Sequence, residues 1–203
     1  LLKNLDLAVL PIILILIIVL SKQVFAEEFL ISNNELIISG GNVGDSEKIL
    51  ELLEENQAIE TIILKEVWGG TQDKAIEILD LIIDFELDTH ISGYCWGNCI
   101  FIFMAGENRT MERGAEIAIE FHSYTFDFLK EIIEDKTYEV IGSLEEYIIW
   151  IDNTSREEIV EYFSILIERG ADPKFVIESV RKGSIDTYVP RRKILLKANI
   201  LTE

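Results

Sequence analysis

Residues 91–105, ISGYCWGNCIFIFMA, are the stretch on which the prediction of the fold rests. The segment 88–92 before it has the composition of a short strand, and the glycines that follow indicate a turn from Gly93 to Cys99. Residues 100–105 are wholly apolar, so the helix that they predict must be buried on all sides. The stretch therefore predicts a strand, a glycine-containing turn and a buried helix.

Short strands and amphipathic helices alternate in the sequence before this stretch. Strands are predicted at 29–32, 35–39 and 59–67, and apolar residues at helical spacing predict helices at 46–57 and 71–87. Parallel strands need crossover connections, so this alternation predicts an α/β fold with a mostly parallel sheet and helices packed against it.

The second half of the sequence predicts one more strand and then a helical C-terminal part. The strand covers 116–121 and ends just before His122. Helical segments are predicted at 126–133, 143–169 and 173–182, with a short last one at 190–198, separated by glycine and proline.

The first 26 residues have the order of a secretory signal peptide. Lys3 precedes an uncharged apolar segment, residues 7–20, and small residues lead to Ala26. We expect cleavage after Ala26, which leaves 27–203 as one exported domain, periplasmic or extracellular. A membrane anchor formed by the uncleaved segment is the alternative, although its 14 residues are fewer than the roughly 20 that a spanning helix needs.

The charge of the chain excludes nucleic acid as a partner. The 203 residues include 18 basic and 37 acidic ones, a net charge of −19. Cleavage would remove two lysines and one aspartate, giving −20. Nucleic-acid binding needs clustered Lys and Arg, and the short run 191–193 is too small for that purpose. The acidic surface favours solubility.

Four pieces of sequence, in this order and spacing, resemble the Clp-type serine proteases and the related crotonase group. They are Trp68-Gly-Gly70, Ile91-Ser-Gly-Tyr-Cys-Trp-Gly-Asn-Cys99, Ala105-Gly-Glu-Asn-Arg109 and Ile119-Glu-Phe-His122. The resemblance runs from about residue 36 to the end of the chain. It implies the ββα superhelix of that group, with a mostly parallel sheet and a helical C-terminal part.

The resemblance also implies roles for particular residues. His122 matches the family's general base, and Asp186 matches the acid that orients this base, with Asp172 as the alternative. Gly69 and Gly70 match the loop whose backbone N–H groups stabilise the oxyanion. The other histidine, His90, is interpreted as a partly exposed residue of its strand.

Gly97 stands where the family has its catalytic serine, and glycine has no side chain that could attack a carbonyl. The resemblance therefore predicts a degenerate homologue that binds peptides or protein partners without cleaving them. An active hydrolase would need another nucleophile, for which Cys95, Cys99 and Ser123 are the candidates. A crotonase-like reaction needs no serine, but export would separate the chain from coenzyme A.

The remaining predictions concern the cysteines, the tryptophans and assembly. Export places Cys95 and Cys99 in an oxidising compartment, where a disulfide between them requires the turn to tighten. Two cysteines without a nearby histidine do not form a zinc site, so we expect neither metal nor cofactor. Trp68 and Trp96 could line a binding site or belong to the core. The family's habit of forming rings implies a homo-oligomer, assembled through residues 143–169.

Overall fold

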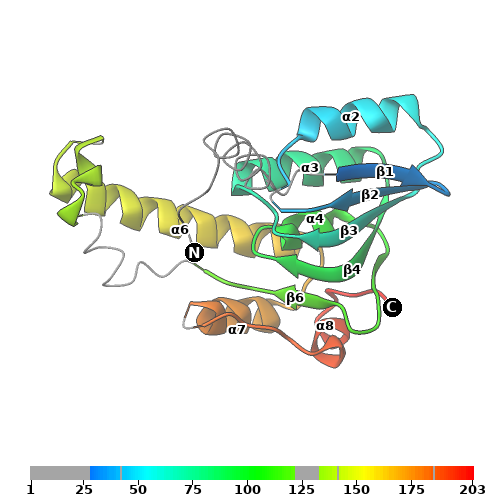
Figure 1. Cartoon of the computed structure of the whole chain (residues 1–203). Coiled ribbons are helices and arrows are strands. Elements are labelled where there is room, and N and C mark those ends of the chain that lie inside the picture. The colour runs from blue at the N-terminus through cyan, green and yellow to red at the C-terminus, as the bar shows by residue number, and fades with distance from the viewer. Residues whose placement is uncertain (1–27, 42, 122–132, 141, 185) are drawn as a thin grey trace, which may run out of the picture.

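A computed structural model describes residues 28–41, 43–121, 133–140, 142–184 and 186–203. Its strands are β1 (Glu28–Ser32), β2 (Glu35–Ser39), β3 (Thr61–Val67), β4 (Asp88–Trp96), β5 (Arg109–Met111) and β6 (Glu116–Ala118). Its helices are α2 (Ser46–Glu55), α3 (Gln72–Asp84), α4 (Cys99–Ala105), the 3₁₀ helix η1 (Thr137–Val140), α6 (Leu144–Glu168), α7 (Pro173–Gly183) and α8 (Arg192–Lys197). Figure 1 shows their arrangement.

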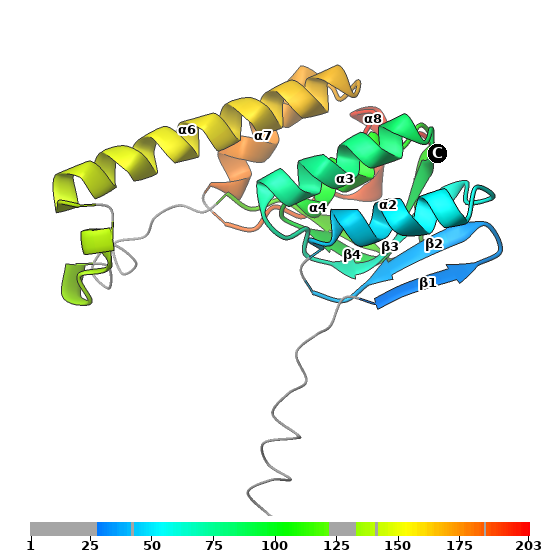
Figure 2. The same cartoon turned by 90° about the horizontal axis from the view of Figure 1, so that it is seen from above.

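The sheet confirms the predicted α/β class with mostly parallel strands. Its order is β1-β2-β3-β4-β5, in which β5 pairs with the first half of β4. The second half of β4 pairs with β6. Among the described strands, only β1 and β2, which a tight turn joins, pair antiparallel. The pairs β2–β3, β3–β4, β4–β5 and β4–β6 are all parallel. Helices α2, α3 and α4 lie in a layer on one face of the sheet (Figure 2).

The core lies between this helical layer and the sheet. Along β2 and β3 alternate residues are buried, among them Leu36, Ile38, Ile62 and Leu64, which are all fully inaccessible. All seven residues of α4 are buried, as its apolar sequence predicts. Burying one methylene group contributes about 0.8 kcal/mol to the free energy of unfolding. The many buried apolar side chains of this layer therefore stabilise the fold.

Around β4 the structure differs from the sequence prediction in two respects. The predicted turn at Gly93 is not a turn, because β4 continues to Trp96. Gly93 instead lies opposite a β-bulge, where the pairing shifts between Lys65 and Val67. Gly93 has φ +92°, which glycine adopts without strain, so the strand can absorb the irregularity and continue. In addition, the strand β5 was not predicted, since three residues are too few for a visible alternation.

Arg109, the first residue of β5, fastens the C-terminal tail to the sheet. It is 7% exposed, and its guanidinium donates hydrogen bonds to the carbonyls of Gly106, Asn199 and Ile200 at 2.9–3.0 Å. Burial lowers the pKa of this side chain. The arginine of the family-like motif therefore has a structural task.

Helix α6 begins at a complete capping box. The Ser143 side chain accepts from the Glu146 backbone N–H, and the Glu146 carboxylate accepts from the Ser143 N–H. The first half of α6 projects away from the sheet, whereas its second half lies beside α4 and α7 (Figures 1 and 2). The predicted helix at 126–133 and the predicted signal peptide fall outside the described residues, apart from Ile133 of the former.

Candidate functional site

The candidate site is built around the junction of β4 and α4, where Gly97 lies. Gly97 has φ +56°, and its N–H donates to the carbonyl of Ala118 in β6 at 3.1 Å. The next N–H groups bond three residues back, from Ile100 to Gly97 and from Phe101 to Asn98, which tightens the turn.

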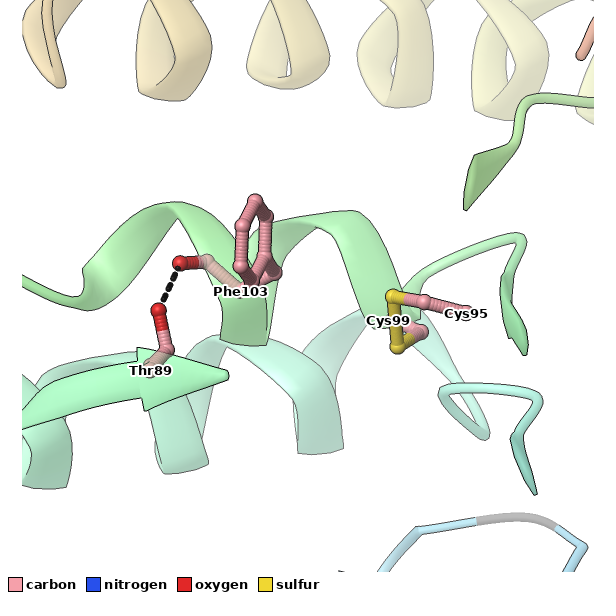
Figure 3. The surroundings of a disulfide bond; sticks show 4 residues. All are labelled: Thr89, Cys95, Cys99 and Phe103. Carbon is pink, nitrogen blue, oxygen red and sulfur yellow. Dashed lines mark hydrogen bonds between the residues drawn. A yellow bond between two sulfur atoms is a disulfide. The ribbon is translucent and has the colours of Figure 1, made fainter. Parts of the chain in front are cut away.

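A disulfide bond joins Cys95 and Cys99 across this tightened turn, with their Cα atoms 5.4 Å apart. It ties the end of β4 to the first residue of α4, and both cysteines are fully buried. Near the other end of α4, the buried hydroxyl of Thr89 donates to the carbonyl of Phe103 at 2.7 Å. Figure 3 shows both links. The helix behind Gly97 is thus fastened to β4 at both ends, and neither sulfur is a free thiol.

The structure brings the Gly69-Gly70 loop against Asn98 and Cys99, at the start of α4. A Cβ atom on Gly69 would lie 1.9 Å from the backbone nitrogen of Cys99, so only glycine fits there. The Asn98 amide donates to the carbonyl of Gly70 at 3.0 Å. The described residues offer no acceptor to the N–H groups of Gly69 and Gly70. Of the two, Gly70 lines the cavity described next, whereas Gly69 is buried and does not line it.

Gly97 and Gly70 open onto a cavity of about 460 Å³. This volume lies within the usual range of small-molecule and side-chain pockets, about 300–1,000 Å³. Its walls come from the loop after β3, the β4–α4 turn, the segment after β6 and one face of α6. The lining side chains are Trp68, Thr71, Gln72, Trp96, Asn98, Ile100, Phe101, Ile119, Glu120, Phe121, Ser155, Glu158, Ile159 and Tyr162.

Two aromatic groups frame the cavity. Trp68, Tyr94 and Trp96 contact one another with ring centroids 4.8–6.2 Å apart, and Trp68 Nε1 donates to the Tyr94 hydroxyl at 3.1 Å. Trp68 is 48% exposed, so this group is at the protein surface. On the inner side, Tyr162 packs edge-on against Phe101 and Phe121. Both tryptophans of the sequence prediction therefore line the cavity.

Tyr162 fixes α6 against α7 behind the cavity. Its hydroxyl lies 3.0 Å from Ser179 Oγ, which in turn donates to the carbonyl of Val176 at 2.7 Å. Burial raises the pKa of Tyr162, so the phenol stays protonated. We interpret it as a packing residue and not as an acid or base.

His122 and Ser123 lie outside the described residues. The chain reaches them from Phe121, which lines the cavity and whose N–H donates to the carbonyl of Gly183 at 3.1 Å. Tyr188 forms an antiparallel bridge with Ile119. The segment before His122 therefore lies beside the loop that follows α7.

The two candidate acids lie at opposite ends of α7. Asp186 is on that loop, exposed, and its carboxylate accepts from the N–H of Thr187 at 2.8 Å. Asp172 caps the start of α7 by accepting from the N–H of Lys174 at 2.8 Å. Of the two, Asp186 lies on the loop that forms the bridge to Ile119.

His90 is a half-buried strand residue, as interpreted from the sequence. Its Nδ1 lies 2.8 Å from the Thr110 hydroxyl, and burial lowers its pKa. It lies on the half of β4 that pairs with β5, whereas Gly97 follows the half that pairs with β6.

Sequence reasoning missed the wall that α6 contributes. Ser155, Glu158, Ile159 and Tyr162 are spaced as one helical face. This spacing was visible in the sequence, but the element that the face contacts was not.

The described parts of the chain contain neither a membrane-spanning helix nor a metal site. No helix there is long and apolar enough to cross a bilayer. Nor does any group of three or more His, Cys, Asp or Glu side chains in those parts have the arrangement of a metal site. The apolar segment 7–20 lies outside them.

Comparison with known proteins identifies the fold. No protein-family model and no curated protein matches the sequence. Among solved structures, ClpP1 from Listeria monocytogenes aligns with a TM-score of 0.54 at 15% identity, over 84% of this chain and 89% of that one. A ClpP1 point mutant from the same organism aligns with the same TM-score at 18% identity, over 84% and 90%. The chain therefore has a Clp protease-like fold.

Proposed function

We propose that the protein is an exported, degenerate member of the Clp protease and crotonase group, with the ββα superhelix of that group, which binds peptides or protein partners without cleaving them. The observation that carries the proposal is Gly97. It opens onto the cavity beside the Gly69-Gly70 loop but supplies no attacking atom. Binding groups are thus retained where the nucleophile is missing.

The backbone N–H group of Gly70, which lines the cavity, suits a peptide carbonyl. In an enzyme such donors stabilise the oxyanion that forms after nucleophilic attack. Without attack they can still donate to the ground-state carbonyl of an extended peptide. The apolar and aromatic wall of Ile100, Phe101 and Ile159 would take one of its side chains.

An active hydrolase is the alternative, with His122 as base and Cys95, Cys99 or Ser123 as nucleophile. The disulfide occupies both sulfurs and so argues against the cysteines. Ser123 is then the remaining candidate. A fluorophosphonate probe separates the two functions, because it labels an activated serine and leaves a binding protein unmodified.

Binding can be tested with a pair of matched variants on α6. Ser155 lines the cavity and Ser164 does not, yet both hydroxyls donate to the carbonyl four residues before them. We expect Ser155→Trp to fill the cavity and abolish peptide binding, measured by anisotropy of a labelled peptide library. Ser164→Trp should bind as the wild type does. Equal binding by both variants would place the peptide elsewhere and contradict the proposal.

Restoring the missing side chain tests the ancestry of the site. A Cβ atom on Gly97 would touch only the Trp68 carbonyl, at 3.4 Å, so a serine has room there, although the φ of +56° costs it about 1–2 kcal/mol. Gly97→Ser should acquire probe labelling, and adding His122→Ala should abolish it. If Gly97→Ser stays unlabelled while folded, the assignment of the catalytic position is wrong.

A homo-oligomer is a second proposal, supported by the projecting half of α6. Ile148, Ile149 and Trp150 are 48–54% exposed there, on a helix that leaves the body of the domain. Adjacent exposed apolar side chains of this size favour a contact with a further copy. Sedimentation of the wild type should show an oligomer, and Ile149→Asp should dissociate it. A wild-type monomer at high concentration would contradict the assembly.

Export is proposed from the first 26 residues alone. N-terminal sequencing of the protein recovered from its cells should begin at Glu27. Recovery of the uncleaved chain in the membrane fraction would instead support an anchor.

A further inference from the structure

The cavity beside Gly97 carries two carboxylates on different walls. Glu120 comes from the segment after β6, and Glu158 comes from α6. Both carboxylate side chains are exposed rather than buried. None of the described residues that line the cavity is basic. The cavity is therefore negatively charged as well as aromatic.

Most of the neutral polar side chains that line the cavity already have partners within the protein, but Trp96 Nε1 has none among the described residues. The Asn98 amide donates to the carbonyl of Gly70, and the Gln72 amide donates to Glu161. Glu120 accepts one long hydrogen bond, 3.3 Å from the Thr187 hydroxyl. The two carboxylates thus keep most of their accepting capacity for a ligand.

The aromatic walls favour the same kind of ligand as the carboxylates. Trp68 and Trp96 both line the cavity, and Trp68 is 48% exposed. A cation within about 6 Å of an indole face is attracted by the ring quadrupole, most strongly at tryptophan. The long methylene stem of Lys or Arg would pack against the apolar wall at Ile159.

We propose that this cavity selects a cationic side chain, lysine or arginine, of the bound peptide, through Glu120 and Glu158. The inference rests on the proposed peptide-binding function and adds the chemical class of the ligand to it. The net charge of −19 adds a long-range attraction for basic segments, which speeds encounter but does not choose a position in the peptide.

The test uses the purified protein and three peptides that differ at one position, with lysine, norleucine or glutamate there. Affinities are measured by titration calorimetry at 50 and 300 mM salt. We expect the lysine peptide to bind at least about fivefold more tightly than the norleucine peptide, as one partly desolvated charge pair allows. The glutamate peptide should bind most weakly, and high salt should narrow these differences.

A charge-matched control separates the cavity from the overall charge. Glu158→Gln should weaken the preference for lysine over norleucine, and adding Glu120→Gln should remove it. Glu157→Gln removes the same single charge from the same helix as Glu158→Gln does, at an exposed position that does not line the cavity, and should leave the preference intact.

Each outcome has a distinct meaning. Equal binding of lysine and norleucine peptides overturns the inference but leaves peptide binding standing. A preference that Glu157→Gln abolishes, or that survives the double substitution, also overturns it, because the selection would then lie outside the cavity. If none of the three peptides binds, nor a peptide library, the proposed function itself fails.

Discussion

Two glycines at the candidate site differ sharply in the space around them, and this difference predicts their tolerance of alanine. Both have positive φ, +81° at Gly69 and +56° at Gly97, which costs a non-glycine residue about 1–2 kcal/mol. At Gly97 an added Cβ atom would make one ordinary contact, with the Trp68 carbonyl oxygen at 3.4 Å. Gly97→Ala should therefore lose about 1–2 kcal/mol of the free energy of unfolding.

Gly69→Ala adds a steric term to the same backbone cost. Its Cβ atom would lie 1.9 Å from the nitrogen of Cys99 and 2.3 Å from the carbonyl carbon of Asn98. Both are backbone atoms at the start of α4, which the disulfide holds, so the loop must move as a whole. Such overpacking costs about 1–3 kcal/mol, which brings the expected loss for Gly69→Ala to roughly 3 kcal/mol or more.

Urea unfolding under non-reducing conditions, followed by circular dichroism, measures both variants against the wild type. Gly44→Ala is the control, because nothing lies within 4 Å of its added methyl group and its φ is not positive. Its free energy of unfolding should change by less than about 0.5 kcal/mol. Losses for Gly69→Ala and Gly97→Ala that agree within this margin would refute the packing of the loop on α4.

Three further predictions concern the disulfide, the C-terminal tail and pH. Replacing Cys95 and Cys99 by serine opens a ring with a separation of only four residues, so the expected loss is about 2 kcal/mol, measured by the same unfolding assay. Arg109→Met leaves three buried carbonyls without their charged donor and should cost at least about 3 kcal/mol, whereas Arg181→Met, at an exposed ion pair, should change the free energy of unfolding far less. The hydrogen bond from Arg181 lowers the pKa of Glu178 from 4.5 to about 2. The stabilisation from this pair is therefore complete above pH 4.5 and lost as the pH falls toward 2, and an NMR titration midpoint near 4.5 would contradict it.

Local patterns were enough to predict most helices and the central strands. In α3, Ala75, Ile78, Leu79 and Ile82 are the buried residues, and their spacing in the sequence already indicates one apolar face. Likewise, the wholly apolar α4 could only be a buried helix. Such predictions succeed because the spacing of apolar residues within one helix or strand reflects which of its faces is buried.

The end of β4 could not be predicted in this way. Gly93 indicated a turn, but the bulge at Glu66 on the neighbouring strand lets β4 continue past it. The role of Arg109 was also hidden, because its three acceptors belong partly to the tail some 90 residues later. Both features depend on a second segment, and a pattern within one segment carries no trace of its partner.

In the candidate site, too, some features follow from the sequence and others only from the tertiary structure. Residue 97 is glycine and has no side-chain atom that could attack a carbonyl, and the sequence alone shows this. Folding alone brought Glu158 and Tyr162 of α6 across from Gly97 to form a cavity, and placed Asp186, rather than Asp172, on the loop bridged to Ile119. The type of residue at position 97 determines which chemistry that position can perform. The packing of α6, which lies far away in the sequence, determines what can bind beside it.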